Sequence, residues 1–314
     1  MDVRMKEKSG EGVKDKADVR PDMDTDTAAD LADTAGAEDR SVQERAEYDI
    51  RKTCHKKLFT PFAKAINRYG LLSPGDKVAV CISGGKDSFL TAKLFQELKR
   101  HRKFDFDLVF ISMNPGYNEA NRRLILHNAD ILGIPLHMFS SEIFDIVDTV
   151  DKNPCYLCAR MRRGHLYAKA KELGCNKIAL GHHYDDVIET ILMGMLYGAQ
   201  MQTMMPKVRS TNFEGMELIR PMYLIREADI IKWAERNDLH FLQCACHFTE
   251  SYEALHPGEI SDSARLETKK LIARLKEDNP FVESNIFNSA HNVNLSTVLA
   301  YKQNGVVHEF TEWY

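Results

Sequence analysis

The chain has 314 residues, of which 44% are hydrophobic, and a formal net charge of −4 at pH 7. It holds no apolar run long enough to span a bilayer and no basic-then-apolar leader, so we expect a cytoplasmic protein rather than a membrane or secreted one. Its seven cysteines are an odd number, which disfavours a disulfide framework and favours metal or redox chemistry.

Charge is unevenly distributed along the chain. The first 50 residues hold 15 acidic and 8 basic residues, whereas the remainder holds 31 and 34. No aromatic residue precedes Tyr48, and the earlier residues show no apolar period. Such a segment cannot bury enough surface to offset the entropy lost on ordering, so we expect residues 1–46 to form a disordered acidic tail. The tail would be a solvated spacer, or an interaction or autoinhibitory segment.

From residue 47 onward, strand and helix patterns alternate. The expected strands are 78–82, 107–113, 135–139, 177–180, 217–219 and 240–243, and the expected helices are 47–69, 89–95, 120–132, 159–173, 186–197 and 227–236. This alternation predicts an α/β fold over residues 47–250, a doubly wound parallel sheet covered on both faces. Residues 251–314 are expected to form a helical extension, with a helix near 261–277 and then a polar segment.

The loop at 83–88 joins the first of these strands to a helix. Gly84 and Gly85 let the backbone approach a ligand closely, while the helix start supplies free N–H groups and a positive dipole end. Lys86 adds a positive charge, and Asp87 offers an oxygen ligand for a hard cation. The pattern predicts a pyrophosphate cradle of a type different from the Walker loop. The alternative is an ordinary glycine turn capped by serine.

Further polar residues follow the fourth strand, at 181–190. In a parallel sheet, ligands bind beyond the carboxyl ends of the strands, where residues 83–88, 114–116 and 181–186 all fall. Asp185 and Asp186, beside His183, would hold Mg²⁺ or position a nucleotide there. Capping of the next helix is the alternative for one of the two aspartates.

The cysteines divide into two groups. Cys155 and Cys158 are expected in a loop before a basic helix, and Cys244 and Cys246 follow the last expected strand, at the same sheet edge. Four thiolates would suit zinc, and three would suit an iron–sulfur cluster with one open iron. The remaining cysteines are expected to be small buried residues; they are Cys54, Cys81 and Cys175.

Basic residues are concentrated just after the cysteine pair. They are Arg160, Arg162, Arg163, His165, Lys169 and Lys171, and Lys52, Lys56 and Lys57 would extend the same surface. The cluster predicts either a solvated helix face or a surface that binds the phosphate backbone of RNA.

Two resemblances make these expectations more specific. The signature Ser83-Gly84-Gly85-Lys86-Asp87-Ser88 resembles the PP-loop of the ATP pyrophosphatase superfamily, which implies cleavage of ATP to AMP and pyrophosphate. Over residues 50–250 the chain also resembles the tRNA 2-thiocytidine synthetase family. Besides that loop, the motifs that carry the resemblance are Cys155-x-x-Cys158, Arg160-Met161-Arg162-Arg163-Gly164, Leu180-Gly181-His182-His183-x-Asp185-Asp186, Arg220-Pro221 and a downstream cysteine.

The second resemblance implies a ligand set. In that family, two paired cysteines and one later cysteine bind a 4Fe-4S cluster whose fourth iron is free to carry sulfide. The implied ligands here are Cys155, Cys158 and one of Cys244 or Cys246, with Cys244 preferred. The family usually has two residues between its later cysteines, whereas this chain has one, Ala245.

The resemblance also implies a mechanism. The phosphates of ATP would lie on residues 83–88, the adenine near Met113 and Asn114, and further nucleotide contacts at Gly181 and His182. Mg²⁺ would bridge phosphate oxygens with help from Asp87 and Asp186, and Lys86 would stabilise the developing charge. A base carbonyl of tRNA, at C2 of cytidine, would attack the α-phosphate, and sulfide would then displace AMP. Sulfide itself or a cysteine desulfurase relay would supply the sulfur.

Three other functions remain open at this point. One is a PP-loop ligase of the lysidine synthetase type with zinc on its cysteines. Another is a thiolase that acts on a different tRNA position or on a small molecule. The third is a redox-sensing nucleotide-binding protein without catalytic activity. The sequence also leaves the oligomeric state open, with a homodimer as one option.

Overall fold

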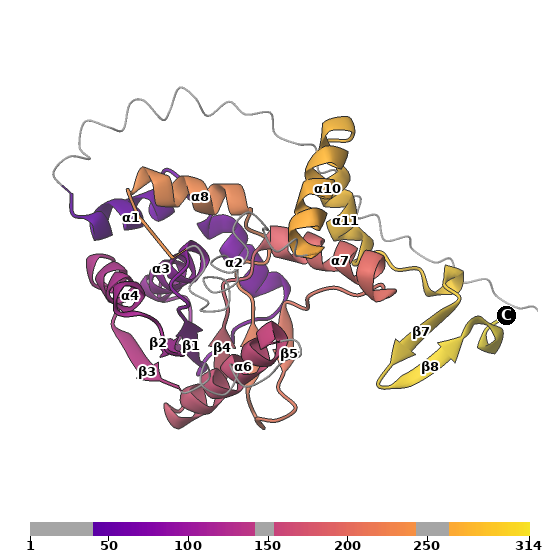
Figure 1. Cartoon of the computed structure of the whole chain (residues 1–314), viewed down its shortest axis with the longest axis horizontal. Coiled ribbons are helices and arrows are strands. Elements are labelled where there is room, and N and C mark those ends of the chain that lie inside the picture. Colours follow the sequence, from indigo (N-terminus) through magenta and orange to yellow (C-terminus); the bar gives the residue numbers. More distant parts are fainter. Residues whose placement is uncertain (1–39, 142–153, 243–263) are drawn as a thin grey trace, which may run out of the picture. The chain divides into compact units, whose positions relative to one another are not determined.

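The computed structural model describes residues 40–141, 154–242 and 264–314, without the side chains of residues 154–160. Its centre is a six-stranded sheet in the order β3-β2-β1-β4-β6-β5 (Figure 1). The strands are β1 (Lys77–Cys81), β2 (Asp107–Asn114), β3 (Leu136–Ser140), β4 (Lys177–Ala179), β5 (Lys207–Arg209) and β6 (Glu217–Ile219). All neighbouring pairs are parallel except β5 with β6.

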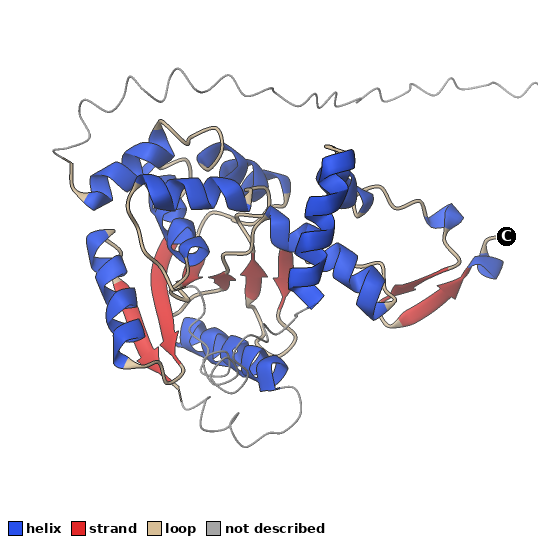
Figure 2. Ribbon diagram, turned by 45° about the horizontal axis from the view of Figure 1, so that its top comes forward, coloured by secondary structure: helices blue, strands red, loops and turns tan. Residues whose placement is uncertain are grey.

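Side chains of β1 alternate between two apolar clusters. Val78 and Val80 belong to the larger cluster, whereas Ala79 and Cys81 belong to a smaller one that includes Tyr167. The larger cluster packs under α1 (Val42–Arg51), α2 (Phe59–Arg68), α3 (Lys86–Arg100), α4 (Glu119–Ile131) and α8 (Glu227–Arg236), and the smaller one packs under α6 (Pro154–Glu172). Helices therefore cover both faces of the sheet (Figure 2), which confirms the predicted doubly wound fold.

The order of the strands reverses between β1 and β4. The chain passes from β1 to β2 and β3 on one side, and β4 then pairs with the other side of β1. Loops that leave two such strands diverge, so a crevice opens between them. Residues 83–88 and 181–186 follow these two strands, which places both predicted motifs at this point.

The helix expected over 47–69 is in fact two helices, α1 and α2, and α1 already begins at Val42. Pro61 explains the break, because its nitrogen has no hydrogen to donate and its ring would clash with the preceding turn of a continuous helix. In the structure Pro61 lies in the first turn of α2, where no donor is needed.

Two further expectations were wrong. The cysteine pair does not lie in a loop, because α6 begins at Pro154, a residue suited to the first turn of a helix. The described part of the strand expected at 240–243 is not a strand. The edge beside β6 is taken by β5, and Phe241 packs instead near Phe89 and Trp233, at centroid distances of 5.3 and 6.4 Å.

The C-terminal part contains more than the expected helix and polar segment. Helices α10 (Ala264–Asp278) and α11 (Val282–Ser289) pack against α7 (Tyr184–Gly198) (Figure 1), and the rings of Tyr184 and Phe287 stack at 4.4 Å. Strands β7 (Ala300–Gln303) and β8 (Val306–Glu309) then form an antiparallel hairpin. Its turn, Asn304-Gly305, has positive φ at both positions, as a tight hairpin turn requires. Among the helices described, none is both long and apolar enough to cross a membrane.

Candidate active site

The loop 83–88 is held in shape by its own last serine. The Ser88 hydroxyl accepts a hydrogen bond from the Ser83 amide at 3.2 Å and donates one to the Gly85 carbonyl at 2.8 Å. Gly84 has a φ of +99°, a conformation that favours glycine. Gly85 is the N-cap of α3 and supplies no side-chain acceptor to its first turn. The first amides of α3 are thus free of a side-chain cap and suited to an anion.

Glycines keep this loop in close contact with its neighbours. A Cβ on Gly84 would lie 2.7 Å from the Cδ1 atom of Leu242, and one on Gly181 would lie 3.0 Å from the backbone of Asp87. The backbone after β4 therefore lies directly against the start of α3. The two motifs form one cradle with no room for larger side chains, which fits a phosphate held by backbone groups.

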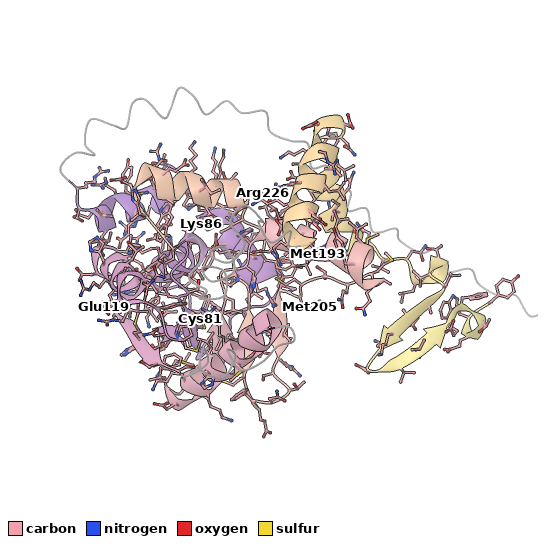
Figure 3. The ribbon with its side chains drawn as sticks, in the orientation of Figure 1. Cys81, Lys86, Glu119, Met193, Met205 and Arg226 are labelled. Carbon is pink, nitrogen blue, oxygen red and sulfur yellow. The ribbon has the colours of Figure 1, made fainter. Side chains whose placement is uncertain are left out.

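Charged groups lie around the start of α3, where Figure 3 labels Lys86. The Lys86 ammonium lies 3.3 Å from Asp87 and 3.1 Å from Glu227, whose second oxygen contacts Lys269 at 2.5 Å. Burial tends to raise the pKa of Glu227, but the hydrogen bonds from Lys269 and Lys86 outweigh it and hold that pKa at about 2. Burial raises the pKa of Asp87 despite the opposing charge of Lys86. The Asp87 Oδ1 atom is buried and accepts no hydrogen bond within the described part of the chain, and the Lys86 ammonium lies 3.3 Å from it, so the position already suits a cation.

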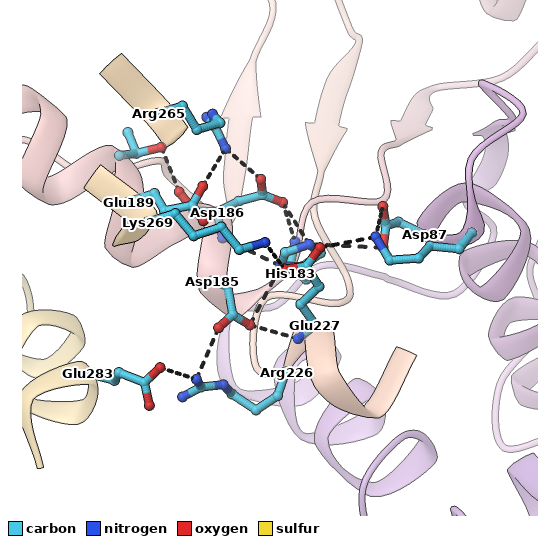
Figure 4. Close-up of polar contacts among 12 residues, drawn as sticks. Asp87, His183, Asp185, Asp186, Glu189, Arg226, Glu227, Arg265, Lys269 and Glu283 are labelled. Carbon is cyan, nitrogen blue, oxygen red and sulfur yellow. Dashed lines mark hydrogen bonds and ion pairs between the residues drawn. The ribbon is translucent and has the colours of Figure 1, made fainter. Parts of the chain in front are cut away.

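Both aspartates of the second motif take part in helix capping. His183 and Asp186 form a capping box at the start of α7, and Asp185 accepts a hydrogen bond from the Glu227 amide at 2.7 Å. Arg226 lies 3.0 Å from Asp185 (Figure 4). Capping of the helix that follows thus applies to Asp186 alone, as the alternative for one of the two aspartates predicted, whereas Asp185 binds the first amide of α8. Neither contact excludes a second role, because each carboxylate has further acceptor capacity.

Helix α10 adds two basic residues that the sequence analysis missed. The Arg265 guanidinium lies 2.7 Å from Asp186 and 2.9 Å from Glu189, and Lys269 binds Glu227, one turn further along the helix (Figure 4). Arg265 and Lys269 are four residues apart on a predicted helix, so the sequence did indicate that they lie on the same helix face. Nothing in the sequence indicated which carboxylates they would contact.

A cavity of about 420 Å³ lies beside the cradle. Its lining residues are Cys81, Ile82, Ser83, Asp87, Ser88, Met113, Arg162, Arg163, Leu166, Leu180, Gly181, His182 and Asp186. Met113, expected near the adenine, is among them. Asn114 is not, and its side-chain oxygen accepts hydrogen bonds from the amides of Gly116 and Tyr117. Gly85 and Lys86 line a neighbouring cavity of about 440 Å³, which also touches Asp87.

A larger cavity, of about 1030 Å³, lies between α1, α3 and the start of β2. Most of its charged groups form ion pairs, as Lys93 does with Glu47 at 2.8 Å. None of the residues predicted to bind ATP or metal lines it, so the chemistry is assigned to the cradle.

The basic cluster of α6 faces more than one environment. Arg162 and Arg163 line the 420 Å³ cavity, and Arg162 donates a hydrogen bond to the Tyr117 hydroxyl at 2.8 Å. Lys169 pairs with Glu172 at 2.6 Å, and Lys171 is exposed. The two arginines thus belong to the cavity rather than to a purely solvated face.

The paired cysteines are placed by the backbone of α6 alone. Positions 155, 158, 162 and 166 recur at intervals of three and four, so they fall on one side of the helix. Arg162 and Leu166 of that series line the cavity, which is where the cysteines would be required. The expected third ligand, Cys244 or Cys246, lies outside the described residues. Among the residues whose side chains the structure describes, no three His, Cys, Asp or Glu side chains lie together as a metal site would require.

The other three cysteines are buried, as expected. Burial raises the pKa of Cys54 to about 11 and that of Cys81 to about 12, and it also raises the pKa of Cys175. Thiols in this state are poor nucleophiles and poor metal ligands at neutral pH.

A glycine cradle at the switch point of a parallel sheet defines a nucleotide-binding α/β protein. Residues 52–253 match the family model described as a PP-loop domain. The tRNA-cytidine(32) 2-sulfurtransferase of Paracidovorax citrulli is 33% identical over 294 residues, which cover 92% of this chain and 86% of that protein. The tRNA-cytidine(32) 2-sulfurtransferase 1 of Francisella philomiragia is 39% identical over 256 residues, covering 79% and 93%. The chain belongs to the PP-loop family and, within it, to the tRNA-cytidine(32) 2-sulfurtransferase family.

A solved structure shares the fold. The U34-tRNA thiolase NcsA from Methanococcus maripaludis, with its 4Fe-4S cluster, has a TM-score of 0.60 at 22% sequence identity. The match covers 79% of this chain and 84% of that one.

Proposed function

We propose that this protein is an ATP-dependent tRNA sulfurtransferase that replaces the oxygen at C2 of a cytidine by sulfur. The observation that carries the proposal is the contact between the amide-rich loop 83–88 and Gly181, because it builds a phosphate cradle next to a cavity with both acidic and basic walls. The names of the related sulfurtransferases supply the substrate class. We assign the activity to residues 47–250, with 251–314 as an extension.

In the first step, the base oxygen attacks the α-phosphate of ATP. An O–P bond forms, the bond between the α-phosphate and the bridging oxygen breaks, and pyrophosphate leaves. The amides at the start of α3 and the hydroxyls of Ser83 and Ser88 would hold the phosphates, and Lys86 would offset the charge that develops on them. Met113 and Asn114 would lie near the adenine, and Gly181 and His182 near the rest of the nucleotide.

The buried Oδ1 atom of Asp87 suits it to bind Mg²⁺ together with Asp186, and the cation would take up the acceptor capacity that now faces the Lys86 ammonium at 3.3 Å. Asp186 already contacts Arg265 at 2.7 Å, so a cation there would share or displace that guanidinium. A bound Mg²⁺ would supply positive charge to the phosphate oxygens. The catalytic residues proposed are therefore Lys86, Asp87 and Asp186.

In the second step, sulfur forms a bond with C2, the C–O bond breaks, and the oxygen leaves with AMP. A 4Fe-4S cluster on Cys155, Cys158 and Cys244, with Cys246 as the alternate third ligand, would supply sulfur at the activated carbon. The spacing along α6 supports this assignment, because it aligns the paired cysteines with Arg162 and Leu166 of the cavity wall. The protein itself would exclude water and hold the adenylated base against that wall.

The first experiment is to measure iron, zinc and acid-labile sulfide in anaerobically purified protein, and then AMP and pyrophosphate formation with and without tRNA. About four irons and four sulfides per chain, with tRNA-dependent AMP formation, would support the proposal. The variant Asp87→Asn should lose AMP formation, whereas Asp107→Asn, at the exposed start of β2, should keep it. Zinc without sulfide, or AMP formation independent of tRNA, would contradict the proposal.

A further inference from the structure

Arg220 is a buried cation that lies behind the lining of the 420 Å³ cavity and is not itself one of the lining residues. Its side chain and backbone together are only 7% exposed. It directly follows β6, and the Leu180 amide donates to the Ile219 carbonyl at 3.0 Å, so Arg220 lies beside Leu180 and Gly181 of the cavity lining. Leu218, two residues earlier, packs with Tyr167 of α6, which indicates that Arg220 lies on the α6 side of the sheet.

The partners of Arg220 do not neutralise its charge. One Nη atom donates a hydrogen bond to the carbonyl of Met205. The Nε atom is buried and has no hydrogen-bond partner within the described residues. Over the same residues, no carboxylate forms an ion pair with Arg220. A buried guanidinium in this state is costly, so its retention requires another explanation.

A second arginine acts against the positive charge of Arg220. Burial, followed by the positive charge of Arg163, lowers the pKa of Arg220 to about 10. Burial, followed by the charge of Arg220, lowers the pKa of His182 to about 4. Arg163 and His182 both line the cavity. At neutral pH His182 is therefore uncharged, and the two positive charges that meet here are Arg220 and Arg163. The carboxylate of Asp186 offsets the charge of Arg220 in part, and burial and Arg163 outweigh it, so an anion would relieve the remaining repulsion.

We propose that Arg220 and Arg163 form a phosphate subsite at the β6 end of the cavity, separate from the cradle at 83–88. A guanidinium is suited to a phosphate because its planar donors contact two oxygens at once. The phosphate would be the α-phosphate of the bound nucleotide or a backbone phosphate of the RNA beside the reacting base. The choice of these two phosphate sources rests on the proposed function, because ATP and tRNA are its substrates.

Binding measurements with AMP, adenosine and an unmodified tRNA transcript test the subsite. The variants are Arg220→Met and Arg163→Gln, with Arg209→Gln as control, because the Arg209 side chain is 91% exposed and lies on β5. If the nucleotide supplies the phosphate, both variants should bind AMP at least about tenfold more weakly, with adenosine binding unchanged. If RNA supplies it, tRNA binding should weaken and its dependence on log salt should become shallower by about 0.7–0.9.

The proposal is overturned if both variants bind AMP and tRNA within twofold of the control, or if the unaltered protein binds neither probe. Should Arg220→Met fail to fold, the exposed position of Arg163 leaves Arg163→Gln to decide. None of these measurements requires turnover. Protein that binds both probes but forms no AMP would therefore contradict the proposed function and leave the phosphate subsite standing.

Discussion

The contact between Gly181 and the loop 83–88 can be tested by adding a single methyl group. A Cβ on Gly181 would lie 3.0 Å from the carbonyl carbon and oxygen of Asp87 and 3.1 Å from the amide nitrogen of Ser88. These are backbone atoms at the start of α3, so they cannot rotate away as the end of a side chain can. The variant Gly181→Ala must therefore push the end of β4 and the start of α3 apart by a few tenths of an ångström.

We expect Gly181→Ala to lower the free energy of unfolding by about 1–3 kcal/mol, the usual result of overpacking an interior. The displaced atoms belong to the proposed phosphate cradle, so ATP affinity should also fall by at least about tenfold, or about 1.4 kcal/mol. Urea unfolding measures the first effect, and equilibrium binding of ATP measures the second.

The matched control is Gly164→Ala on α6. A Cβ there meets nothing within 4 Å, and alanine is the better helix former, so this variant should be more stable by up to about 1 kcal/mol. Wild-type stability together with wild-type ATP affinity in Gly181→Ala would refute the contact. Lower stability with normal ATP affinity would separate the packing from the phosphate site.

The remaining predictions concern charge. Arg265→Ala should destabilise the protein by about 1–2 kcal/mol at pH 7, because it removes the cation that faces Glu189. Burial already raises the pKa of Glu189, and the loss of Arg265 should raise that pKa further. A carboxyl group with a raised pKa stabilises the fold below its unfolded pKa, and this stabilisation is lost as the pH rises. In urea unfolding, Arg265→Ala should therefore fall short of the wild-type free energy of unfolding by less at pH 5 than at pH 7. An equal shortfall at both pH values would contradict the role given to Glu189. The pKa of His182 is lowered to about 4, so the neutral ring stabilises the fold above pH 6.5 and this stabilisation is lost as the pH falls towards 4. Over that range, the free energy of unfolding of His182→Gln should fall by up to about 3 kcal/mol less than that of the wild type. Thermal unfolding at each pH measures the difference. The double variant Arg162→Gln/Arg163→Gln should bind tRNA more weakly, with a shallower salt dependence in filter binding, and unchanged binding would remove these arginines from the RNA contact.

Local patterns in the sequence were sufficient for the frame of the fold. Strands β1, β2, β4 and β6 are largely buried apolar runs, and such runs are recognisable because both faces of a parallel sheet are covered. Strand β3, at the edge of the sheet, is apolar at Leu136, Met138 and Phe139 but only half-buried. The motif at 83–88 was readable for a similar reason, because its glycines and its place between strand and helix are properties of neighbouring residues. These signals also placed the loops after β1 and β4 at one edge of the sheet.

Local sequence patterns gave the wrong secondary structure where a proline or a distant segment decided the conformation. Pro61 divides a segment that otherwise has a continuous helical period, and Pro154 starts α6 early enough to include the cysteine pair. The apolar residues at 240–242 have the composition of a strand, but Phe241 packs near Phe89 and Trp233 because β5 already occupies the sheet edge. Composition alone does not reveal such competition for an edge.

The sequence by itself determined five of the six strands, the ligand edge of the sheet and the glycine cradle, because each of these signals depends on residues close together in the chain. Only the tertiary structure decided which charges meet there. Arg265 and Lys269 reach Asp186 and Glu227 from a helix outside the predicted domain, and Arg220 is left buried beside another arginine. These side chains, 79 and 42 residues apart, pair according to packing in three dimensions, and no period or local spacing encodes that packing.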